Sequence, residues 1–460
     1  MPRFSIVVPA HNVEPYLREC LDSLLNQTFG DFEVICVDDA STDGTRAVIE
    51  EYCARDKRIR LVVNTVNMHL FATRHVGVRE TTGEYVTFVD GDDALTIDAL
   101  ENLDAVLKED PVDILQFCMK VVPQEGVELL GDEWCLARYE PRLLKGDEIV
   151  RTVCYEQPED MCTHHRMIRG DLARRVLVDL GFDRNLHVSE DITEQTALMI
   201  SANTYRIINP ADYYIYNLGR GGNGANELLS KEQFSKLNLA KWRCYKTLMR
   251  YLDDFELHNP GDDMAIAWRW RYACAQSLWH WSASVVPEDR ADSLVEFAGM
   301  WPIGWVLTQI YNFIADDIEE LFCPGSVFRD DRILSAEQDL AINLECLARL
   351  FPLYDRNPVN SDITSEVWQD MARQAAECAA NETRPSDELL MTCLRGICLF
   401  ARNEEWFTDD KLQQYESIDR QLEKAQSELD DIVTSRSYRL SSLLAKPYRF
   451  IRRGRTKDGK

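Results

Sequence analysis

The sequence lacks the features that mark several common classes of protein. Its 460 residues include 14 cysteines but no CxxC pair, and the cysteines lie in apolar segments such as residues 34–37. We therefore expect reduced, buried thiols and neither a disulfide framework nor a zinc site. Basic residues are scarce, because 51 Lys and Arg face 78 Asp and Glu, for a formal net charge of -27. This balance argues against nucleic acid as a partner, since phosphate binding needs a basic face.

Long hydrophobic runs are also missing. The longest uncharged stretch, residues 297–315, contains Pro302, Gly304 and several polar residues. We therefore expect it to form a buried helical hairpin, with a membrane span as the alternative. The first eight residues lack the apolar length of a signal peptide. Together these features predict a cytoplasmic protein.

Short apolar runs alternate with amphipathic stretches in the N-terminal part of the chain. The apolar runs predict strands at residues 4–9, 32–37, 60–64, 85–89 and 114–122, and the amphipathic stretches predict helices at 16–27, 45–56 and 70–81. Continuous apolar strands separated by helices are typical of a parallel sheet covered on both faces. Ligands on such sheets bind at the carboxyl ends of the strands. The residues directly after each strand are therefore the candidate site residues.

Composition divides the chain into four segments. Residues 1–225 carry the strand–helix alternation, and residues 226–408 predict a helical accessory domain rich in Trp. Residues 409–435 have apolar positions at heptad spacing, which predicts a short coiled coil and with it a homodimer. Residues 436–460 hold nine Lys and Arg against one acid, mixed with large apolar side chains. This basic amphipathic tail suits an anionic membrane surface, and a disordered solubilising tail is the alternative.

Carboxylates follow two of the predicted strands. Asp38 and Asp39 come directly after residues 32–37, and Asp90 and Asp92 come directly after residues 85–89. Acidic groups gathered at one edge of a sheet repel one another unless a cation lies among them. Hard oxygen ligands beside a phosphate suit Mg²⁺ or Mn²⁺. We expect Asp92, with Asp90, to hold this metal; a solvated acidic turn is the alternative.

Four motifs resemble those of family 2 glycosyltransferases of the GT-A fold, in the family's order. They are residues 6–12, 37–45, 90–93 and 189–191, and the resemblance covers about residues 4–220. It implies an α/β fold with a GT-A nucleotide-sugar-binding domain, whose largely parallel sheet has flanking helices, followed by the helical domain and the coiled coil. It also implies inverting transfer from a nucleoside diphosphate sugar, most simply a UDP-sugar, to a glycan acceptor with Mn²⁺ or Mg²⁺ as cofactor.

The resemblance assigns donor-binding roles to the first two motifs. Pro9 and His11 would line the base pocket, where many relatives have Tyr in place of His11. Asp39 would face the base or ribose, with Asp38 beside it. The alternative for His11 is a surface loop residue.

The third motif and the stretch before it would complete the donor site. Asp90 would touch the ribose, Asp92 would hold the metal that bridges the phosphates, and Gly91 lies between them. Arg74 matches the arginine that approaches the nucleotide, with an exposed helix arginine as the alternative. Near Arg74 the sequence departs from the family, because His69 replaces a glycine, Thr73 an alanine and His75 an asparagine. These departures leave the donor sugar open.

The resemblance places catalysis on Asp191 and Glu190. Asp191 would be the general base that takes the proton of the acceptor hydroxyl, and Glu190 would orient the acceptor or support Asp191. The alternative is an acid pair favoured by a helix N-terminus. Arg220 would meet the donor pyrophosphate from a glycine-containing loop, and a simple linker is the alternative.

The resemblance and the tail together lead us to expect an enzyme of cell-surface polysaccharide assembly. It would act on a glycan or lipid-linked acceptor at the inner face of the membrane. Two other functions remain as alternatives. One is a non-catalytic glycan-assembly scaffold that retains the GT-A fold, against which the intact acidic set speaks. The other is a nucleotidyltransferase, which would carry a Gly-rich loop after the first strand, where this chain has Pro9-Ala10-His11-Asn12. The Trp-rich helices would serve either packing or acceptor binding.

Overall fold

The computed structural model of the chain describes residues 1–124, 140–156, 161–181, 185–220, 229–322, 334–353 and 365–381, with a few single positions between these ranges and up to 396. The chain divides into two compact units. The first comprises Met1–Asn226 and Leu237–Tyr272, and the second comprises Glu227–Lys236 and Ala273–Lys460. The predicted coiled coil and basic tail, with the homodimer and membrane contact that depend on them, lie outside the described residues.

The first unit is built on a nine-stranded sheet. The order along the main path is β3-β2-β1-β4-β8-β6-β9-β5, and β7 pairs with β9. The strands are β1 (Phe4–Ala10), β2 (Phe32–Asp39), β3 (Ile59–Asn64), β4 (Tyr85–Phe88), β5 (Ala94–Leu95), β6 (Ile114–Val121), β7 (Arg142–Lys145), β8 (Arg166–Arg169) and β9 (Thr204–Tyr216).

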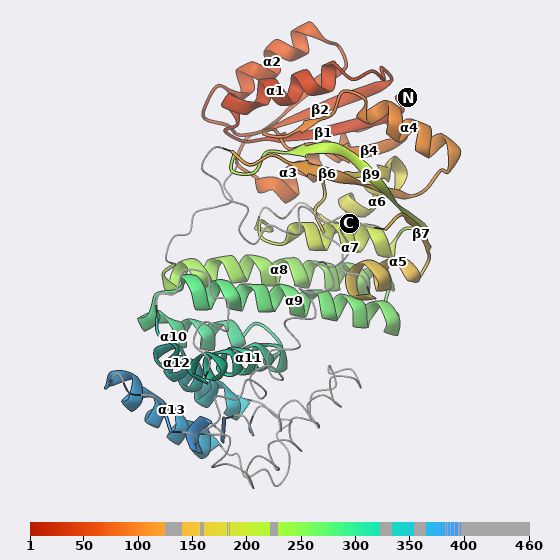
Figure 1. Ribbon diagram of the computed structural model, residues 1–460. Coiled ribbons are helices and arrows are strands. Elements are labelled where there is room, and N and C mark those ends of the chain that lie inside the picture. The colour runs from red at the N-terminus through yellow and green to blue at the C-terminus, as the bar shows by residue number, and fades with distance from the viewer. Residues whose placement is uncertain are drawn as a thin grey trace, which may run out of the picture. The chain divides into compact units, whose positions relative to one another are not determined.

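Helices flank this sheet, and helices also make up most of the described residues that follow it (Figure 1). Those of the first unit are α1 (Glu14–Leu25), α2 (Thr45–Arg55), α3 (His69–Arg79), α4 (Ala99–Glu109), α5 (Glu148–Arg151), the π-helix η2 (Thr152–Glu156), α6 (Gly170–Leu180) and α7 (Glu190–Ile200). Two long helices that contribute to both units follow, α8 (Lys231–Asp254) and α9 (Pro260–Ser284). The second unit adds α10 (Pro287–Ala298), α11 (Ile303–Phe322), α12 (Ala336–Leu350), the 3₁₀-helix η3 (Phe351–Leu353) and α13 (Ser365–Ala380).

The side chains of β1 alternate between the two faces of the sheet. Phe4, Ile6 and Val8 join one buried cluster with apolar residues of α1, α2 and α4, while Val7 meets α3 on the opposite face at Gly77. Figure 1 shows the same layering, with α1 and α2 above the sheet and α3 and α6 below it. A strand covered on both faces is mostly apolar, which is why β1 reads as an apolar run interrupted only by Ser5.

The pairing of the strands is only partly parallel. β1 pairs in parallel with β2 and β4, and β2 with β3, as the sequence predicts. Beyond β4 the sheet is mixed, because β8 pairs antiparallel with both β4 and β6, while β6 and β9 are parallel. The carboxyl ends of β1 to β4 therefore lie at one edge of the sheet, where the candidate residues follow.

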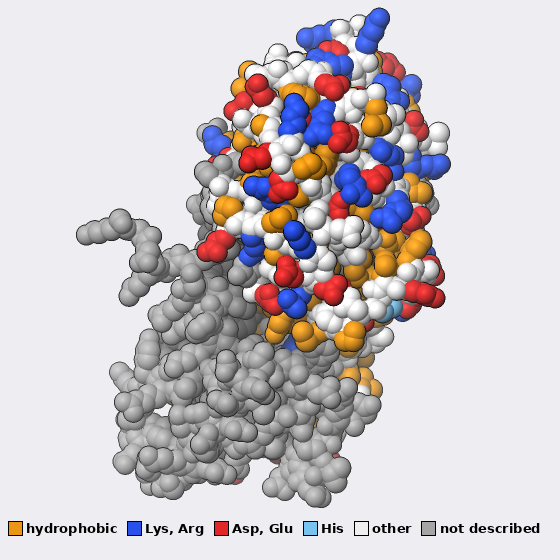
Figure 2. All heavy atoms as spheres, turned by 90° about the vertical axis from the view of Figure 1, so that its right-hand side faces the viewer, with side chains coloured by type: hydrophobic (Ala, Val, Ile, Leu, Met, Phe, Trp, Pro, Cys, Tyr) orange, Lys and Arg blue, Asp and Glu red, His pale blue; other side chains and the backbone are white. Residues whose placement is uncertain are grey.

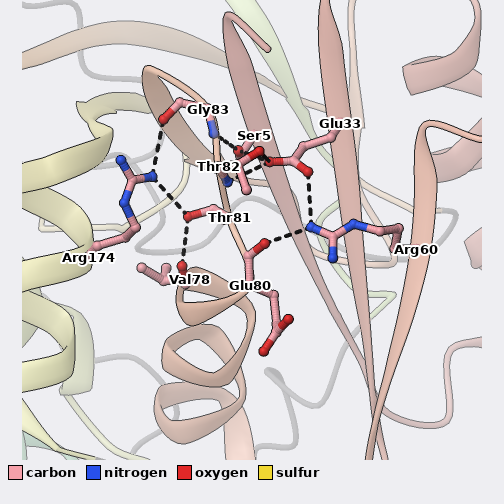
Figure 3. A network of polar contacts seen from close by, with 9 residues as sticks. All are labelled: Ser5, Glu33, Arg60, Val78, Glu80, Thr81, Thr82, Gly83 and Arg174. Atoms are coloured by element: carbon pink, nitrogen blue, oxygen red, sulfur yellow. Dashed lines mark hydrogen bonds and ion pairs between the residues drawn. The ribbon is translucent and has the colours of Figure 1, made fainter. Parts of the chain in front are cut away.

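A polar network fixes the opposite edge of the sheet. The Glu33 carboxylate accepts hydrogen bonds from the Ser5 hydroxyl at 2.7 Å, from the backbone N–H of Thr82 at 2.6 Å and from Arg60 at 3.0 Å. Arg174 donates to the backbone oxygen of Gly83 in the same turn (Figure 3). Burial alone would raise the pKa of Glu33, but these hydrogen bonds outweigh it, and the pKa lies below its usual value. The network ties β1, β2 and β3 to the turn between α3 and β4.

Surface charge is mixed on the face of the first unit that Figure 2 shows. Lys and Arg side chains alternate there with Asp and Glu. The excess of acidic residues is therefore not gathered into one negative patch on this face.

The described part of the second unit is helical. The stretch at residues 297–315 lies at the end of α10 and in α11, which are separated by a short turn with Pro302. Trp305, Ile310 and Ile314 of α11 are buried, so this stretch contributes to a helical core, as expected. Among the described helices, none has both the length and the apolarity needed to span a membrane.

Candidate active site

Asp39 ends β2 with its carboxylate held from two sides. Its Oδ1 accepts hydrogen bonds from Asn64 Nδ2 and from the backbone N–H of Met68, both at 2.8 Å. The parallel register pairs Asp39 with Asn64 at the end of β3. The neighbouring Asp38 instead closes its own turn, because its Oδ1 accepts from the backbone N–H of Ser41 at 3.2 Å. Asp39 thus has a fixed orientation at the edge where the resemblance expects a nucleotide.

His11 lies directly beside Asp39 and is exposed. Its Nδ1 is 2.7 Å from the backbone oxygen of Asp39, and its Nε2 is 3.1 Å from Asn67 Nδ2. A carbonyl oxygen only accepts, so Nδ1 carries the proton and Nε2 accepts from the Asn67 amide. The imidazole is therefore held beside Asp39 in one orientation and one tautomer.

Strained backbone gathers around the same edge. Of the six described non-glycine residues with positive φ, four border the site: Asn12 (53°), Ala40 (56°), His69 (60°) and Ser189 (61°). Such conformations cost free energy and often mark functional sites. His69 stands where the family resemblance has glycine, which adopts this conformation without strain. Its ring stacks on that of His187, with centroids 5.0 Å apart.

The loop after β4 is anchored by β9. Asp93 Oδ2 accepts a hydrogen bond from the Tyr214 hydroxyl, and its Oδ1 accepts one from the backbone N–H of Asn217, each at 2.7 Å. The Tyr214 oxygen in turn accepts from the backbone N–H of Asp90 at 3.2 Å. Asp93 is thus committed to holding the loop, which leaves Asp90 and Asp92 for a ligand.

Gly91 allows this loop to approach β1 closely. A Cβ atom at this position would lie 3.0 Å from Val13 Cγ2 and 3.4 Å from the backbone oxygen of Pro9. Pro9 and Gly91, both predicted to line the donor site, are therefore neighbours. Their packing sets how near the Asp90 loop comes to the end of β1.

The carboxylates of this loop lie in an environment that disfavours negative charge. Burial raises the pKa of Asp90 to about 6, with Arg74 opposing the shift and Asp92 adding to it. Burial also raises the pKa of Asp92. It raises that of Asp93 to about 8, with the charge of Asp90 adding to the shift. A cation placed among these groups would relieve the unfavourable charge.

The fit of a divalent metal can be judged from the groups present. Among the described residues, no three His, Cys, Asp or Glu side chains are grouped so as to hold an ion. Asp90 and Asp92 offer two carboxylates, and Asp90 Oδ1 is buried without a hydrogen-bond partner. Mg²⁺ commonly binds through one or two carboxylates together with substrate phosphates and water. These residues therefore fit an ion that arrives with a diphosphate, and do not form a complete protein cage.

Arg74 connects this loop to helix α7. Its side chain is 1% exposed, with Nη2 3.7 Å from Asp90 Oδ1 and Nη1 hydrogen bonded to Asp191 Oδ1. Nη1 also lies 3.3 Å from Glu194 Oε2. Thr163 Oγ1 stands 2.9 Å from the same Asp191 oxygen and 2.8 Å from Glu194 Oε2. One buried guanidinium thus faces three carboxylates, one from the loop after β4 and two from helix α7.

The acid pair at the start of α7 differs in its surroundings. Burial, followed by the charge of Asp191, raises the pKa of Glu190 to about 8. Glu190 is therefore largely protonated near neutral pH and able to donate a hydrogen bond. The Asp191 side chain is 26% exposed. Only its Oδ1 carries hydrogen bonds from described residues, so Oδ2 remains for a substrate.

Arg220 lies at the end of the described part of its loop. Its Nη1 is 2.7 Å from Glu19 Oε2 and 3.4 Å from the backbone oxygen of Asp92, and its guanidinium lies over the Tyr16 ring. The predicted contact with a pyrophosphate stays a prediction. The cation is nonetheless held beside Asp92 by neighbours on α1.

Helix α3 joins the two groups of candidate residues. The group of His11 and Asp39 meets its first turns, because Asn64 contacts Thr73 at 3.4 Å. The group of Asp90 and Asp191 meets the next residue of the helix, Arg74. Contacts with the adjacent residues Thr73 and Arg74 of α3 thus link the two groups of predicted residues.

Four residues of the site were not predicted from the sequence to belong to it: Thr163, His75, Glu194 and Tyr214. Glu194 left one signal, since it stands one helical turn after Glu190 and so lies on the same face of α7.

Comparison with known proteins identifies the N-terminal part of the chain. Residues 5–176 match the model of glycosyl transferase family 2. An uncharacterised glycosyltransferase of Bacillus subtilis (strain 168), EpsJ, is 40% identical over 115 residues, which are 25% of this chain and 33% of that protein. Poly(ribitol-phosphate) beta-N-acetylglucosaminyltransferase TarS of Staphylococcus aureus (strain MW2) is 29% identical over 240 residues, 51% of this chain and 39% of TarS. The chain therefore spans well under half of these relatives.

A solved structure agrees on the fold. S. aureus TarS, in a form crystallised with UDP, superposes with a TM-score of 0.52 at 20% sequence identity, over 78% of this chain and 94% of that one. Residues 5–176 thus match glycosyl transferase family 2, and the first unit, which contains them, has the GT-A fold.

Proposed function

We propose that this chain is a metal-dependent glycosyltransferase. It would move a sugar, with inversion, from a UDP-sugar to a glycan acceptor during assembly of a cell-surface polymer. The observation that supports this most is the convergence of Asp90 and Asp191 on the buried Arg74. A carboxylate predicted to face the donor and one predicted to act as base share one cation, so the predicted donor site lies next to the predicted base.

The donor class is supported by the edge formed by His11 and Asp39. An oriented imidazole can stack on a base, while a fixed carboxylate can accept from a base N–H or a ribose hydroxyl. TarS has been solved with UDP and with UDP-GlcNAc, and it is named for transfer to poly(ribitol-phosphate). These names favour a UDP-sugar as donor and a polymer as acceptor.

In the proposed reaction, the oxygen of the acceptor hydroxyl attacks the anomeric carbon while Asp191 Oδ2 takes the proton of that hydroxyl. The bond from that carbon to the diphosphate breaks, and the configuration inverts. Arg74 and Thr163 hold Oδ1, so that Oδ2 is the oxygen that faces the acceptor. Glu190, protonated near neutral pH, would donate a hydrogen bond to the acceptor. A divalent cation at Asp92 and Asp90 would neutralise charge on the departing diphosphate.

The test is a panel of nucleotide sugars, measured by thermal stabilisation and by nucleotide release with Mn²⁺ or with EDTA. A ligand that binds only the folded state raises its melting temperature. We expect one UDP-sugar to stabilise the protein with Mn²⁺ and to release UDP, and Asp92→Asn to lose the effect of the metal. Glu109→Gln is the control, since this exposed carboxylate lies outside the site. If no nucleotide sugar binds under either condition, the scaffold alternative is favoured.

A further inference from the structure

We infer that His75 and Glu194 are positioning residues for Asp191 that act through Arg74 and Thr163. The inference rests on the proposed function, and it concerns two side chains for which the family resemblance supplies no role. Both are fully buried, and His75 Nε2 lies 2.9 Å from Glu194 Oε1. They connect α3 to α7 directly behind the proposed base.

The number of protons on this pair follows from its partners. His75 Nδ1 lies 2.7 Å from the backbone oxygen of Gly181. Since that oxygen only accepts, Nδ1 carries a proton. The contact between Nε2 and Glu194 Oε1 then needs one further proton, on either atom. The pair is an imidazolium with a carboxylate, or an imidazole with a carboxylic acid, and in both cases it has no net charge.

Because the pair of His75 and Glu194 has no net charge, it does not neutralise Arg74. The positive charge of Arg74 therefore remains available to Asp191 and Asp90. The other oxygen of Glu194, Oε2, already lies 3.3 Å from Arg74 and 2.8 Å from Thr163. An uncompensated carboxylate there would compete with Asp191 for both donors, and in a buried site that competition is strong. His75 weakens this competition because it balances the charge of Glu194, so Arg74 stays directed at Asp191 Oδ1 and Oδ2 stays turned to the acceptor.

The residue type at position 75 matters for this arrangement. The family resemblance has asparagine there, whose amide can donate a hydrogen bond but stays neutral and so cannot balance the charge of Glu194. In this chain an asparagine would leave Glu194 buried with only Arg74 as counter-charge. His75 and Glu194 therefore form a matched pair, in which replacing one member should be worse than replacing both.

The test compares His75→Asn, Glu194→Gln and the double variant by steady-state kinetics with the donor found above. We expect His75→Asn to lower kcat by at least about tenfold, while KM for the donor and Kd for UDP change less than about twofold. The double variant should recover most of the lost kcat, because it has no uncompensated carboxylate. His258→Asn is the matched control, since this histidine contacts Asp253 and Asp263 outside the site, and its kcat should stay unchanged.

A purely structural role predicts something else. If kcat is equally low in His75→Asn and in the double variant, or if it stays at the wild-type value in His75→Asn, the inference is wrong. If His75→Asn does not fold, a folded double variant supports the matched pair and an unfolded double variant contradicts it. Wild-type protein that transfers no sugar would overturn the proposed function instead. Normal transfer by His75→Asn, with Asp191→Asn inactive, overturns only the positioning role.

Discussion

The guanidinium of Arg74 donates a hydrogen bond to the carboxylate of Asp191, although 117 residues separate the two in the sequence. The contact joins helix α3, which packs on the parallel part of the sheet, to the first turn of α7. Any change that shifts α3 relative to the sheet should therefore also displace Asp191, the proposed base.

Gly77→Ala should show this coupling. A Cβ atom at Gly77 would lie 2.4 Å from Val7 Cγ1 and 3.1 Å from Val37 Cγ2, so α3 must shift away from β1 and β2. We expect the free energy of unfolding to fall by about 1–3 kcal/mol, as measured by denaturant titration. Sugar transfer should fall as well, because Arg74 lies one turn earlier on the same helix.

Gly30→Ala provides the matched control for this substitution. No heavy atom lies within 4 Å of a Cβ atom at Gly30. Its unfolding free energy should change by less than about 0.5 kcal/mol, as for most surface substitutions. Equal effects at the two glycines would show that close packing of α3 is not the cause.

Glu33→Gln should weaken the network of Figure 3. The carboxylate accepts from Ser5, Thr82 and Arg60, and hydrogen bonds to a charged group contribute about 1.5–3 kcal/mol. The pKa of Glu33 is below its usual value in the folded protein. Its contribution is therefore present above the unfolded pKa of about 4.3 and is lost as the pH falls through the folded pKa.

The measurement is the melting temperature of wild type and Glu33→Gln from pH 7 down to pH 3. The difference should be largest near neutral pH and shrink toward pH 3. Glu109→Gln, at an exposed carboxylate, should match the wild type throughout. A difference that does not depend on pH would mean that packing, and not charge, explains the loss.

Glu190→Gln should stabilise the protein at neutral and alkaline pH. The folded pKa of Glu190 is raised to about 8, so between about pH 4.3 and pH 8 the folded state holds a proton that the unfolded state has lost. Stability then falls as the pH rises through this window. A neutral glutamine removes that dependence.

Thermal unfolding from pH 5 to pH 8 tests this expectation. The melting temperature of Glu190→Gln should rise above that of the wild type progressively with pH. A variant that is less stable than the wild type at pH 8 would mean that Glu190 is ionised and favourably paired in the folded protein.

Much of the parallel half of the fold could be predicted from the sequence. The strands β1, β2 and β4 are buried along nearly their whole length, so each reads as a mostly apolar run, whereas the edge strand β3 is only partly buried. Because parallel strands place their carboxyl ends at one edge, Asp39 and Asp90 could be assigned to the same edge before any coordinates were known.

The strand expected at residues 114–122 is present as β6, but most of the remaining half could not be predicted, because it depends on long-range contacts. The short strand β8 pairs antiparallel inside the sheet, and only its neighbours β4 and β6 determine that direction. Tyr214 reaches Asp93 across 121 residues, and His75 reaches Glu194 across 119. Neither pair has a local spacing that would reveal it. The departure from the family at His75 is visible in the sequence, whereas the partner that accounts for it is not.

The most direct test of the account is sugar transfer by Asp191→Asn, measured alongside UDP binding by calorimetry. General-base catalysis contributes about 10²- to 10⁴-fold, and Asp191 Oδ2 is the oxygen left to act as base. We predict that transfer falls by at least about a hundredfold while Kd for UDP stays within about twofold of the wild type. Transfer at the wild-type rate by a variant that binds UDP normally would contradict the central claim.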